Sequence, residues 1–289
     1  MPLPGRWLSS LLIRVSGQMT LFDCGEGTQI ALRAAGWGFR RLGAICISHV
    51  HADHIAGLPG LLHTIANSGR VEPVSLVGPH GIEDVVRSLR VIAPVLPYEL
   101  IVSALNPGDT FSLPGGCAGS CAAGVHQLPV LGYRVDLPRG RAFMPERARA
   151  LDVPVDRWQE LQKGQDVRIG ETVVVPEDVL GPPRPGIGVV YVTDTRPTSA
   201  LVELAFGANL LVCEGTYGDD AVQAKAEAYT HMTFREAAMV AREAGVKRLW
   251  LTHFSPSVLD PDAFAANARE VFAETTVGHD GLSIRLSFP

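Results

Sequence analysis

The sequence predicts a protein of the α/β class, in which β-sheets are flanked on their outer faces by helices. Short apolar runs rich in β-branched residues follow one another in the first half of the chain, and strand and helix patterns alternate in the second half. The 289 residues, 46% of them hydrophobic, are enough for one large core. We therefore expect a single domain over residues 1–289, interrupted by one insertion.

The first half contains more strand patterns than helix patterns. The expected strands cover residues 9–15, 19–25, 44–48, 73–79, 100–105, 111–115 and 130–137. The expected helices cover residues 28–35, 54–67 and 81–92. Pro59 falls early in the second of these helices and predicts an irregular first turn or a kink.

The second half begins after an unusual segment. Residues 138–185 alternate prolines and arginines with short amphipathic pieces, which indicates an inserted, arm-like subregion rather than core. The strands expected beyond it cover residues 188–195, 209–216, 248–255 and 282–288. The helices expected there cover residues 199–207, 220–229, 233–245 and 261–272.

Residues 48–62 read SHVHADHIAGLPGLL and place three histidines and an aspartate within six residues. Side chains two apart in an extended segment point the same way, so His49 and His51 share a side, while Asp53 and His54 begin the next helix. Four such ligands crowd a single tetrahedral ion and suit two ions about 3.5–4 Å apart. Imidazole and carboxylate ligands favour zinc, with manganese and iron as alternatives. An ordinary alternative for Asp53 is a helix N-cap.

Further ligands stand next to other expected strands. Asp194 and His253 follow strands and His126 precedes one, and loops at strand ends are where metal sites gather. His231 lies at a helix start, and its role stays open on sequence alone. The remaining histidines have no clustered partners and are expected to be structural: His63, His80 and His279.

Charge and cysteine content narrow the class of protein. The net charge of −5 gives no overall basic field, which counts against a strong non-specific nucleic-acid binder but permits a local basic patch. Five scattered cysteines indicate reduced, buried thiols in a cytoplasmic protein, although the C-x3-C pair Cys117 and Cys121 leaves a disulfide or metal role as an alternative. We expect neither a signal peptide nor a membrane span, because no apolar run reaches about 18 residues.

Further motifs follow in order along the chain. They are LFDCGEGTQ at 21–29, HQLPVLGYRV at 126–135, VTDTRP at 192–197, CEGTY at 213–217, HMTFREAA at 231–238 and LTHFSPS at 251–257. Together with HxHxDH and GLPGLL, they resemble the ribonuclease Z group, the tRNA 3′-end endonucleases of the metallo-β-lactamase fold superfamily. The resemblance implies an αββα sandwich, with two mixed sheets between layers of helices.

The resemblance also implies two zinc ions bridged by one carboxylate, Asp194. The ligands of the first ion would be His49, His51 and His126. The ligands of the second ion would be Asp53, His54 and His253.

The same resemblance implies how the reaction is catalysed. Asp53 would orient and deprotonate an attacking water whose pKa the ions lower. His231, positioned by Glu214, would donate a proton to the leaving 5′ oxygen. Asp23 would stabilise the metal-binding loop.

Three departures from the family concern the substrate and the start of the chain. Residues 151–158 read LDVPVDRW where the family's tRNA-gripping arm carries a Gly-Pro-rich motif. Ser257 stands where the family has an arginine that helps to bind phosphate, and a serine cannot make a bidentate guanidinium contact. The chain starts at MPLPGRW, close to where the family's first strand would end.

Three functions are therefore weighed. The first is a dinuclear zinc endoribonuclease that removes 3′ trailers from precursor tRNA and acts as a homodimer, each arm serving the partner's active site. The second is a hydrolase of a small phosphodiester, ester or lactone that has lost tRNA binding. The third is a metal-stabilised binding or partner subunit without activity, which the retained ligand set disfavours.

Overall fold

The computed structural model describes residues 3–289. The expectation about the start of the chain concerns Met1, which lies outside the described residues. The chain divides into two compact units. The large unit comprises Met1–Leu137 and Gly188–Leu286, and the small unit comprises Pro138–Ile187 and Ser287–Pro289. None of the described helices is long and apolar enough to cross a membrane.

A five-stranded mixed sheet forms the first half of the large unit. Its strands, in spatial order, are β1 (Leu11–Val15), β2 (Gln18–Phe22), β3 (Leu42–Cys46), β4 (Val74–Gly78) and β5 (Leu100–Ala104). β1 pairs antiparallel with β2, and the remaining pairs are parallel.

A seven-stranded mixed sheet forms the second half. Its strands, in spatial order, are β14 (Thr275–Val277), β13 (Leu249–Thr252), β12 (Leu210–Glu214), β11 (Arg184–Val192), β8 (Leu131–Arg139), β7 (Cys117–Ala123) and β6 (Thr110–Leu113). The strands β11 to β14 run parallel, so their carboxyl ends lie at the same edge of the sheet.

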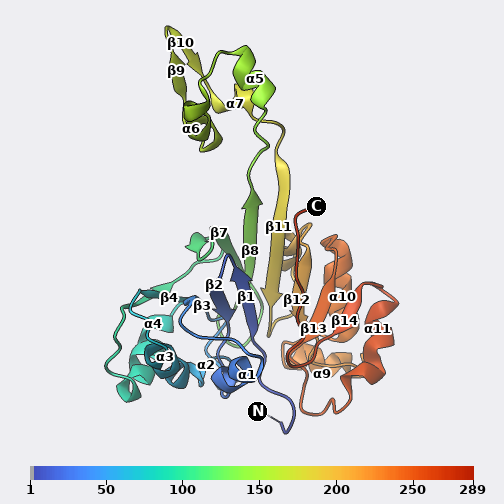
Figure 1. Cartoon of the computed structure of the whole chain (residues 1–289). Helices are drawn as coiled ribbons and strands as arrows, with labels where there is room; N and C mark the ends of the chain where they lie inside the picture. Colours follow the sequence, from blue (N-terminus) through green and yellow to red (C-terminus); the bar gives the residue numbers. More distant parts are fainter. Residues whose placement is uncertain (1–2) are drawn as a thin grey trace. The chain divides into compact units, whose positions relative to one another are not determined.

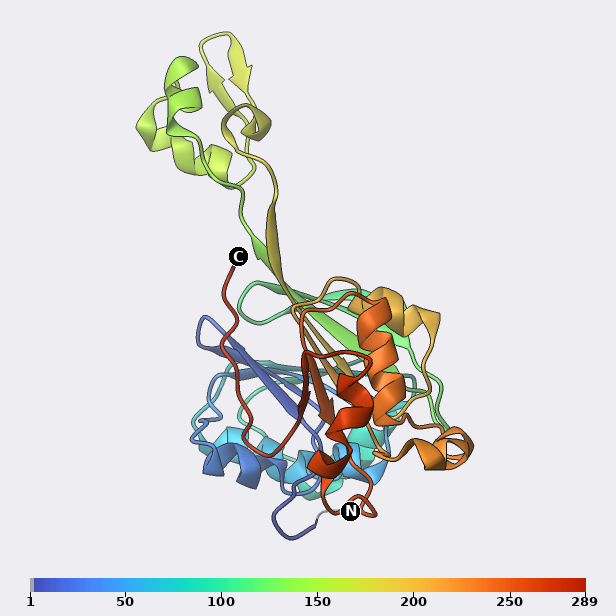
Figure 2. The same ribbon diagram turned by 90° about the vertical axis from the view of Figure 1, so that its right-hand side faces the viewer.

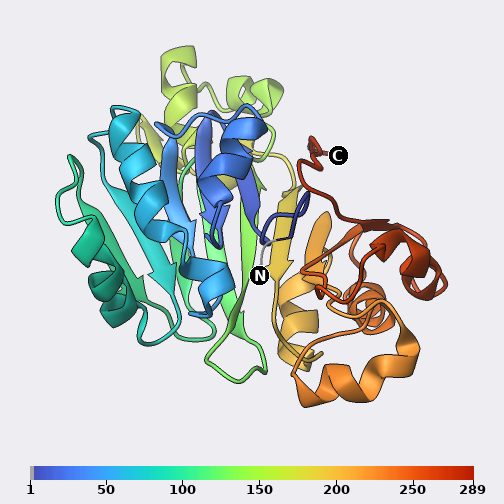
Figure 3. The same ribbon diagram turned by 90° about the horizontal axis from the view of Figure 1, so that it is seen from below.

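Helices cover the outer face of each sheet. The helices of the first half are α1 (Thr28–Ala34), α2 (Ala52–Ile55), α3 (Leu58–Asn67), α4 (Ile82–Leu89) and the 3-10 turn η1 (Arg90–Ile92). Those of the second half are α8 (Ser199–Ala205), η3 (Asp220–Val222), α9 (Gln223–Ala228), α10 (Phe234–Glu243), η4 (Pro261–Phe264) and α11 (Ala265–Arg269). In Figure 3 the blue and cyan helices lie on one side of the two sheets and the orange and red helices on the other. This is the αββα arrangement that the sequence predicts.

Each helical layer has its own apolar core, and an aromatic cluster joins the two sheets. Ile45, Leu61 and Leu76 are fully buried in the core of the first half, and Phe234 and Leu251 in the core of the second. Figure 1 shows α3 and α10 on opposite sides of the sheets, and Figure 2 shows the same chain turned by 90°. Between the sheets, the ring centroid of Phe22 on β2 lies 5.8 Å from that of Tyr133 on β8 and 5.9 Å from that of Tyr191 on β11.

The small unit is a short chain excursion with its own core. It contains α5 (Pro145–Ala150), η2 (Val155–Arg157), α6 (Trp158–Gln162), β9 (Val167–Ile169), β10 (Thr172–Val174) and α7 (Pro176–Val179), with β9 and β10 paired antiparallel. Its buried apolar residues are Ala148, Val153, Leu161, Val167, Val174, Val179 and Leu180.

Most predicted elements are present, one predicted strand is absent, and one observed strand of the large unit was not predicted. The segment 282–288 is not a strand, and the last strand is β14. β7, which runs through the glycine-rich CAGSCAA, was not predicted. The predicted reduced, buried thiols are confirmed, because all five cysteines are free and buried. Cys117 and Cys121 lie on β7 and form no disulfide. The predicted irregularity at Pro59 is confirmed, because the helix is interrupted between α2 and α3 and Pro59 lies in the first turn of α3.

Candidate metal centre

The loop after β3 brings the first group of ligand atoms together. The carbonyl of Ser48 accepts a hydrogen bond of 3.0 Å from the backbone N–H of Leu131, which fixes the loop to the start of β8. His51 Nδ1 lies 2.9 Å from His49 Nε2 and 3.3 Å from His126 Nε2. One carboxylate oxygen of Asp194, Oδ2, lies 3.6 Å from His49 Nε2 and 3.9 Å from His126 Nε2. We call these four residues the first ligand group.

A second ligand group forms beside the first. His54 Nε2 and His253 Nε2 lie 3.3 Å apart, and Asp53 Oδ2 lies 3.6 and 3.7 Å from them. The other oxygen of Asp194, Oδ1, lies 3.3 Å from His54 Nε2 and 3.1 Å from His253 Nε2. Asp194 therefore presents one oxygen to each group.

The spacing of these atoms fits metal ions better than mutual hydrogen bonds. Three imidazole nitrogens that face one another cannot all be paired as donor and acceptor. Ligand atoms about 2.0–2.1 Å from a tetrahedral zinc ion lie about 3.3–3.4 Å from one another, close to the separations seen here. All ligand atoms within each of these groups lie within 4.8 Å of one another.

A buried carboxylate, Asp23, orients the imidazoles of the first half. Its Oδ1 accepts a hydrogen bond of 2.7 Å from the backbone N–H of Ser48. Its Oδ2 accepts from Ser48 Oγ at 2.8 Å, from His54 Nδ1 at 2.8 Å and from Tyr191 OH at 3.0 Å. The hydrogen bond from His54 Nδ1 fixes the ring so that Nε2 faces the second ligand group.

A second buried carboxylate, Glu214 at the end of β12, plays the same structural part in the second half. It accepts hydrogen bonds from Thr195 N at 2.5 Å, Met232 N at 3.0 Å and Thr216 Oγ1 at 2.6 Å. His231 Nδ1 lies 3.2 Å from its Oε2. The His231 ring stacks on that of His253 at a centroid distance of 5.5 Å, so this histidine adjoins the second ligand group without belonging to it.

Backbone strain is concentrated at this centre. Asp23, Asp194 and His253 have φ values of 58°, 48° and 58°, in the left-handed region that residues other than glycine rarely adopt. Asp23 and His253 directly follow β2 and β13, and Asp194 lies two residues beyond the end of β11. Such strain is typical of functional sites, where surrounding contacts hold it in place.

The protonation states follow from burial and from the two carboxylates. Burial lowers the pKa of His49 to about 2, which keeps its imidazole neutral. Burial works against the charged form of His54 as well, but the carboxylates of Asp194 and Asp23 raise its pKa to about 9. The imidazole of His253 holds the pKa of Asp53 below its usual range. The centre thus combines neutral and proton-binding imidazoles with ionised carboxylates, a field that favours cations.

The structure brings all nine residues predicted for the site together in the large unit. His63, His80 and His279 lie elsewhere, with His63 facing the carbonyl of Ile92 and His80 the side chain of Asn106. Asp53 is not a helix N-cap, because His51 occupies that position at the start of α2. Sequence reasoning missed the hydroxyl groups that contact the non-metal-facing nitrogens of the ligand histidines, which are those of Ser48, Thr216 and Thr230. It also missed Tyr191, whose hydroxyl contacts the supporting carboxylate of Asp23.

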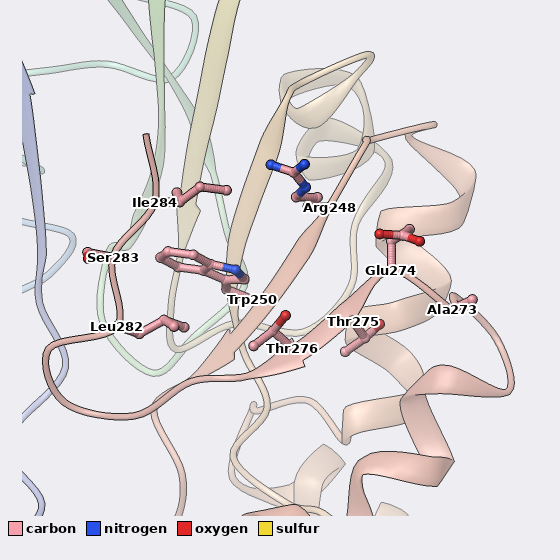
Figure 4. Close-up of a pocket in the computed structure, with 9 residues that line it drawn as sticks. All are labelled: Arg248, Trp250, Ala273, Glu274, Thr275, Thr276, Leu282, Ser283 and Ile284. Atoms are coloured by element: carbon pink, nitrogen blue, oxygen red, sulfur yellow. The ribbon is translucent and has the colours of Figure 1, made fainter. Parts of the chain in front are cut away.

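A separate pocket lies at the edge of the seven-stranded sheet (Figure 4). Its lining comes from β13, β14, the chain before each of them and the segment 282–284, with Trp250 and Arg248 as its largest side chains. The residues of the two ligand groups are not among those that line it.

Comparison with known proteins identifies the family. A family model described as "Anti-Pycsar protein Apyc1" matches residues 5–90. A protein of Lachnoclostridium phytofermentans named ribonuclease Z is 45% identical over 289 residues, covering 100% of this chain and 95% of that protein. A ribonuclease Z of Agathobacter rectalis is 46% identical over 288 residues, with 100% and 95% covered.

Solved structures agree on the fold. The short form of human tRNase Z superposes with a TM-score of 0.68 at 24% identity, covering 100% of this chain and 95% of that one. The metallo-β-lactamase fold protein YhfI of Bacillus subtilis gives a TM-score of 0.68 at 20% identity, with 98% and 93% covered. The chain therefore belongs to the ribonuclease Z family, with the metallo-β-lactamase fold, and is a metal-dependent hydrolytic endoribonuclease that acts on phosphodiester bonds.

Proposed function

We propose that this protein uses two zinc ions to remove 3′ trailers from precursor tRNA. The observation that carries the proposal is the position of Asp194, whose two carboxylate oxygens lie 3.1–3.3 Å and 3.6–3.9 Å from separate sets of imidazole nitrogens. A carboxylate in that position suits a bridge between two ions. His49, His51 and His126 would hold one ion, and Asp53, His54 and His253 the other.

The ligand set fits zinc by its chemistry. Five imidazole nitrogens and two carboxylates match the borderline hard–soft character of zinc, and the distances between the ligand atoms suit tetrahedral ligation. When bound, the ions would lower the pKa of a water molecule and offset the charge of the phosphate. Measurement of metal content after purification in metal-free buffer tests this assignment, and two zinc ions per chain are expected.

Asp53 is the residue best placed to handle the nucleophilic water. Its side chain is 35% exposed and reaches the second ligand group from α2, so it faces both solvent and the ligand atoms. The imidazole of His253 holds the pKa of Asp53 below its usual range, so the carboxylate is ionised and can accept a hydrogen bond from the water that it would orient and deprotonate.

His231 is the residue best placed to protonate the leaving 5′ oxygen. Burial opposes its charged form, but the hydrogen bond and the charge of Glu214 raise its pKa. Its side chain is 15% exposed and stacks beside His253. A protonated imidazole at this position can donate to a leaving alkoxide.

A cleavage assay distinguishes the tRNA substrate from the alternative. Wild-type protein and an Asp53→Ala control are incubated with a precursor tRNA that carries a 3′ trailer and, separately, with a chromogenic phosphodiester. We expect cleavage of the tRNA by wild type and none by the control. Turnover of the small diester without tRNA cleavage would instead favour a hydrolase of small phosphodiesters, esters or lactones, in keeping with the loss of an arginine at Ser257.

We also propose a cytoplasmic homodimer. Five buried, free cysteines suit a reducing compartment. The dimer rests on the resemblance of the sequence to ribonuclease Z. Light scattering coupled to size-exclusion chromatography tests it, with a mass of twice 30.9 kDa expected.

A further inference from the structure

The two buried carboxylates of the centre are used in matching ways. Asp23 follows β2 of one sheet, and Glu214 ends β12 of the other; both are fully buried. Each carboxylate accepts at least one backbone N–H, contacts one imidazole directly and accepts from one aliphatic hydroxyl group, and Asp23 accepts from the Tyr191 hydroxyl as well. The hydroxyls are those of Ser48 and Thr216.

Each hydroxyl joins its carboxylate to a second imidazole. Ser48 Oγ lies 2.8 Å from Asp23 Oδ2 and 3.0 Å from His49 Nδ1. Thr216 Oγ1 lies 2.6 Å from Glu214 Oε2 and 3.1 Å from His253 Nδ1. A hydroxyl has one proton to donate, and a carboxylate is its strongest acceptor, so each hydroxyl must accept the N–H of the imidazole. The lone pair of Nε2 then faces the ligand groups.

The two carboxylate–hydroxyl–imidazole chains, built on Asp23 and Glu214, differ in the imidazole that each carboxylate contacts directly. The imidazole that Asp23 contacts directly, His54, belongs to the second ligand group. The imidazole that Glu214 contacts directly is His231, the proposed proton donor. Glu214 therefore holds a metal ligand through Thr216 and the proton donor without an intermediary, and Thr216 Oγ1 itself lies 3.3 Å from His231 Nδ1.

We propose that Thr216 is a positioning residue that couples the metal ligand His253 to the proton donor His231 through Glu214. The inference rests on the proposed roles of these histidines. Loss of the Thr216 hydroxyl removes the acceptor of the His253 N–H and one of the donors that hold the Glu214 carboxylate under His231. Loss of the Ser48 hydroxyl removes only the acceptor of the His49 N–H and one donor to Asp23.

The experiment compares Thr216→Val, which keeps the side-chain shape, with Thr216→Ser, which keeps the hydroxyl, and with Ser48→Ala as the matched control. Zinc affinity is measured by competition with a chromogenic chelator. Turnover at saturating zinc is measured with two nucleoside phosphodiesters that differ in leaving group. The p-nitrophenyl ester departs without protonation, whereas the phenyl ester depends on a proton donor.

We expect Thr216→Val to bind zinc about 10–100-fold more weakly, the usual range for loss of a group behind a metal ligand. At saturating zinc it should lose at least tenfold more turnover of the phenyl ester than of the p-nitrophenyl ester. Thr216→Ser should restore both properties. Ser48→Ala should weaken zinc binding but change the two esters by the same factor.

Two outcomes overturn the proposal. Equal losses on both esters in Thr216→Val at saturating zinc would show that the hydroxyl does not act on His231. Wild-type zinc affinity in a folded Thr216→Val protein, checked by circular dichroism, would show that it does not hold His253. Neither readout uses RNA, so failure of wild type to cleave precursor tRNA would count against the proposed substrate and not against this coupling.

Discussion

The substitution Asp23→Asn tests whether the Asp23 carboxylate determines which ring nitrogen of His54 carries the proton. It keeps the size of the side chain but replaces one acceptor oxygen with a donor NH2 group. The backbone N–H of Ser48, 2.7 Å from Oδ1, cannot reorient and keeps the amide oxygen on that side. The NH2 group then takes the position of Oδ2, where it faces the Ser48 and Tyr191 hydroxyls, which can rotate, and His54 Nδ1, which lies 2.8 Å away.

In this variant the proton of neutral His54 can lie on Nδ1 or on Nε2, and both positions are unfavourable for metal binding. If its proton stays on Nδ1, a buried charge-assisted hydrogen bond of about 1.5–3 kcal/mol is lost and a buried donor is left unpaired at about 1–3 kcal/mol. If the proton moves to Nε2, the nitrogen that should bind metal carries hydrogen instead. Metal binding at the second ligand group requires the first arrangement, so the combined cost is about 2.5–6 kcal/mol, or about 10²–10⁴-fold in affinity.

The assay is zinc titration against a chromogenic chelator, with Tyr191→Phe as the control. Tyr191→Phe removes a 3.0 Å hydrogen bond to the same oxygen but leaves the His54 contact in place, so it should lower thermal stability and change zinc affinity by less than tenfold. Both proteins must be folded by circular dichroism. Zinc affinity of Asp23→Asn within threefold of wild type would refute the reasoning.

Three further predictions follow from the same geometry. Removal of both metal ions with EDTA should lower the melting temperature by about 10–20 °C, as measured by calorimetry. Each ion present at 100 times its dissociation constant stabilises the folded protein by about 2.7 kcal/mol, and the melting temperature of a domain of this size shifts by about 2–4 °C per kcal/mol. The metal-free protein should be most stable near pH 6.5, the unperturbed histidine pKa. Below about pH 6.5, His49 is protonated in the unfolded chain but not in the folded protein, where its pKa is about 2, so the stability falls as the pH falls. Above about pH 6.5, His54 keeps its proton in the folded protein, where its pKa is about 9, but not in the unfolded chain, and this contribution to stability is lost as the pH rises toward 9. Urea unfolding across pH measures this, and a stability maximum above pH 8 would contradict it. Ser257→Arg should tighten precursor tRNA binding and steepen its salt dependence by about one phosphate contact, without changing turnover of a small diester.

The ligands could be found from the sequence because their pattern is local. HxHxDH packs four of them into six residues, and the others stand directly beside strongly apolar strands. The supporting hydroxyls could not be found in this way. Thr216 becomes informative only when β12 and β13 pair and place its Oγ1 3.1 Å from His253 Nδ1, across 37 residues of sequence.

The errors in the fold have a similar origin. β7 is built from Cys, Ala, Gly and Ser, which have little preference for strands, and it forms because β6 and β8 pair with it on both sides. Residues 282–288 alternate apolar and polar side chains as a strand would, yet they pair with no strand of the sheet, which ends at β14. Alternation predicts a half-buried surface, and pairing partners decide whether the surface becomes a strand.

The altered arm motif has a structural explanation that leaves the metal centre unaffected. Within 151–158, Val153 is buried in the core of the small unit and its carbonyl accepts a hydrogen bond of 3.0 Å from the indole N–H of Trp158. The Trp158 ring also packs on Phe143, at a centroid distance of 5.1 Å, and lies under the guanidinium of Arg149. These contacts stay within the small unit, whereas every contact that orients the ligand groups stays within the large unit. Residues 151–158 therefore contribute to the core of the small unit, and none of these contacts reaches the ligand groups.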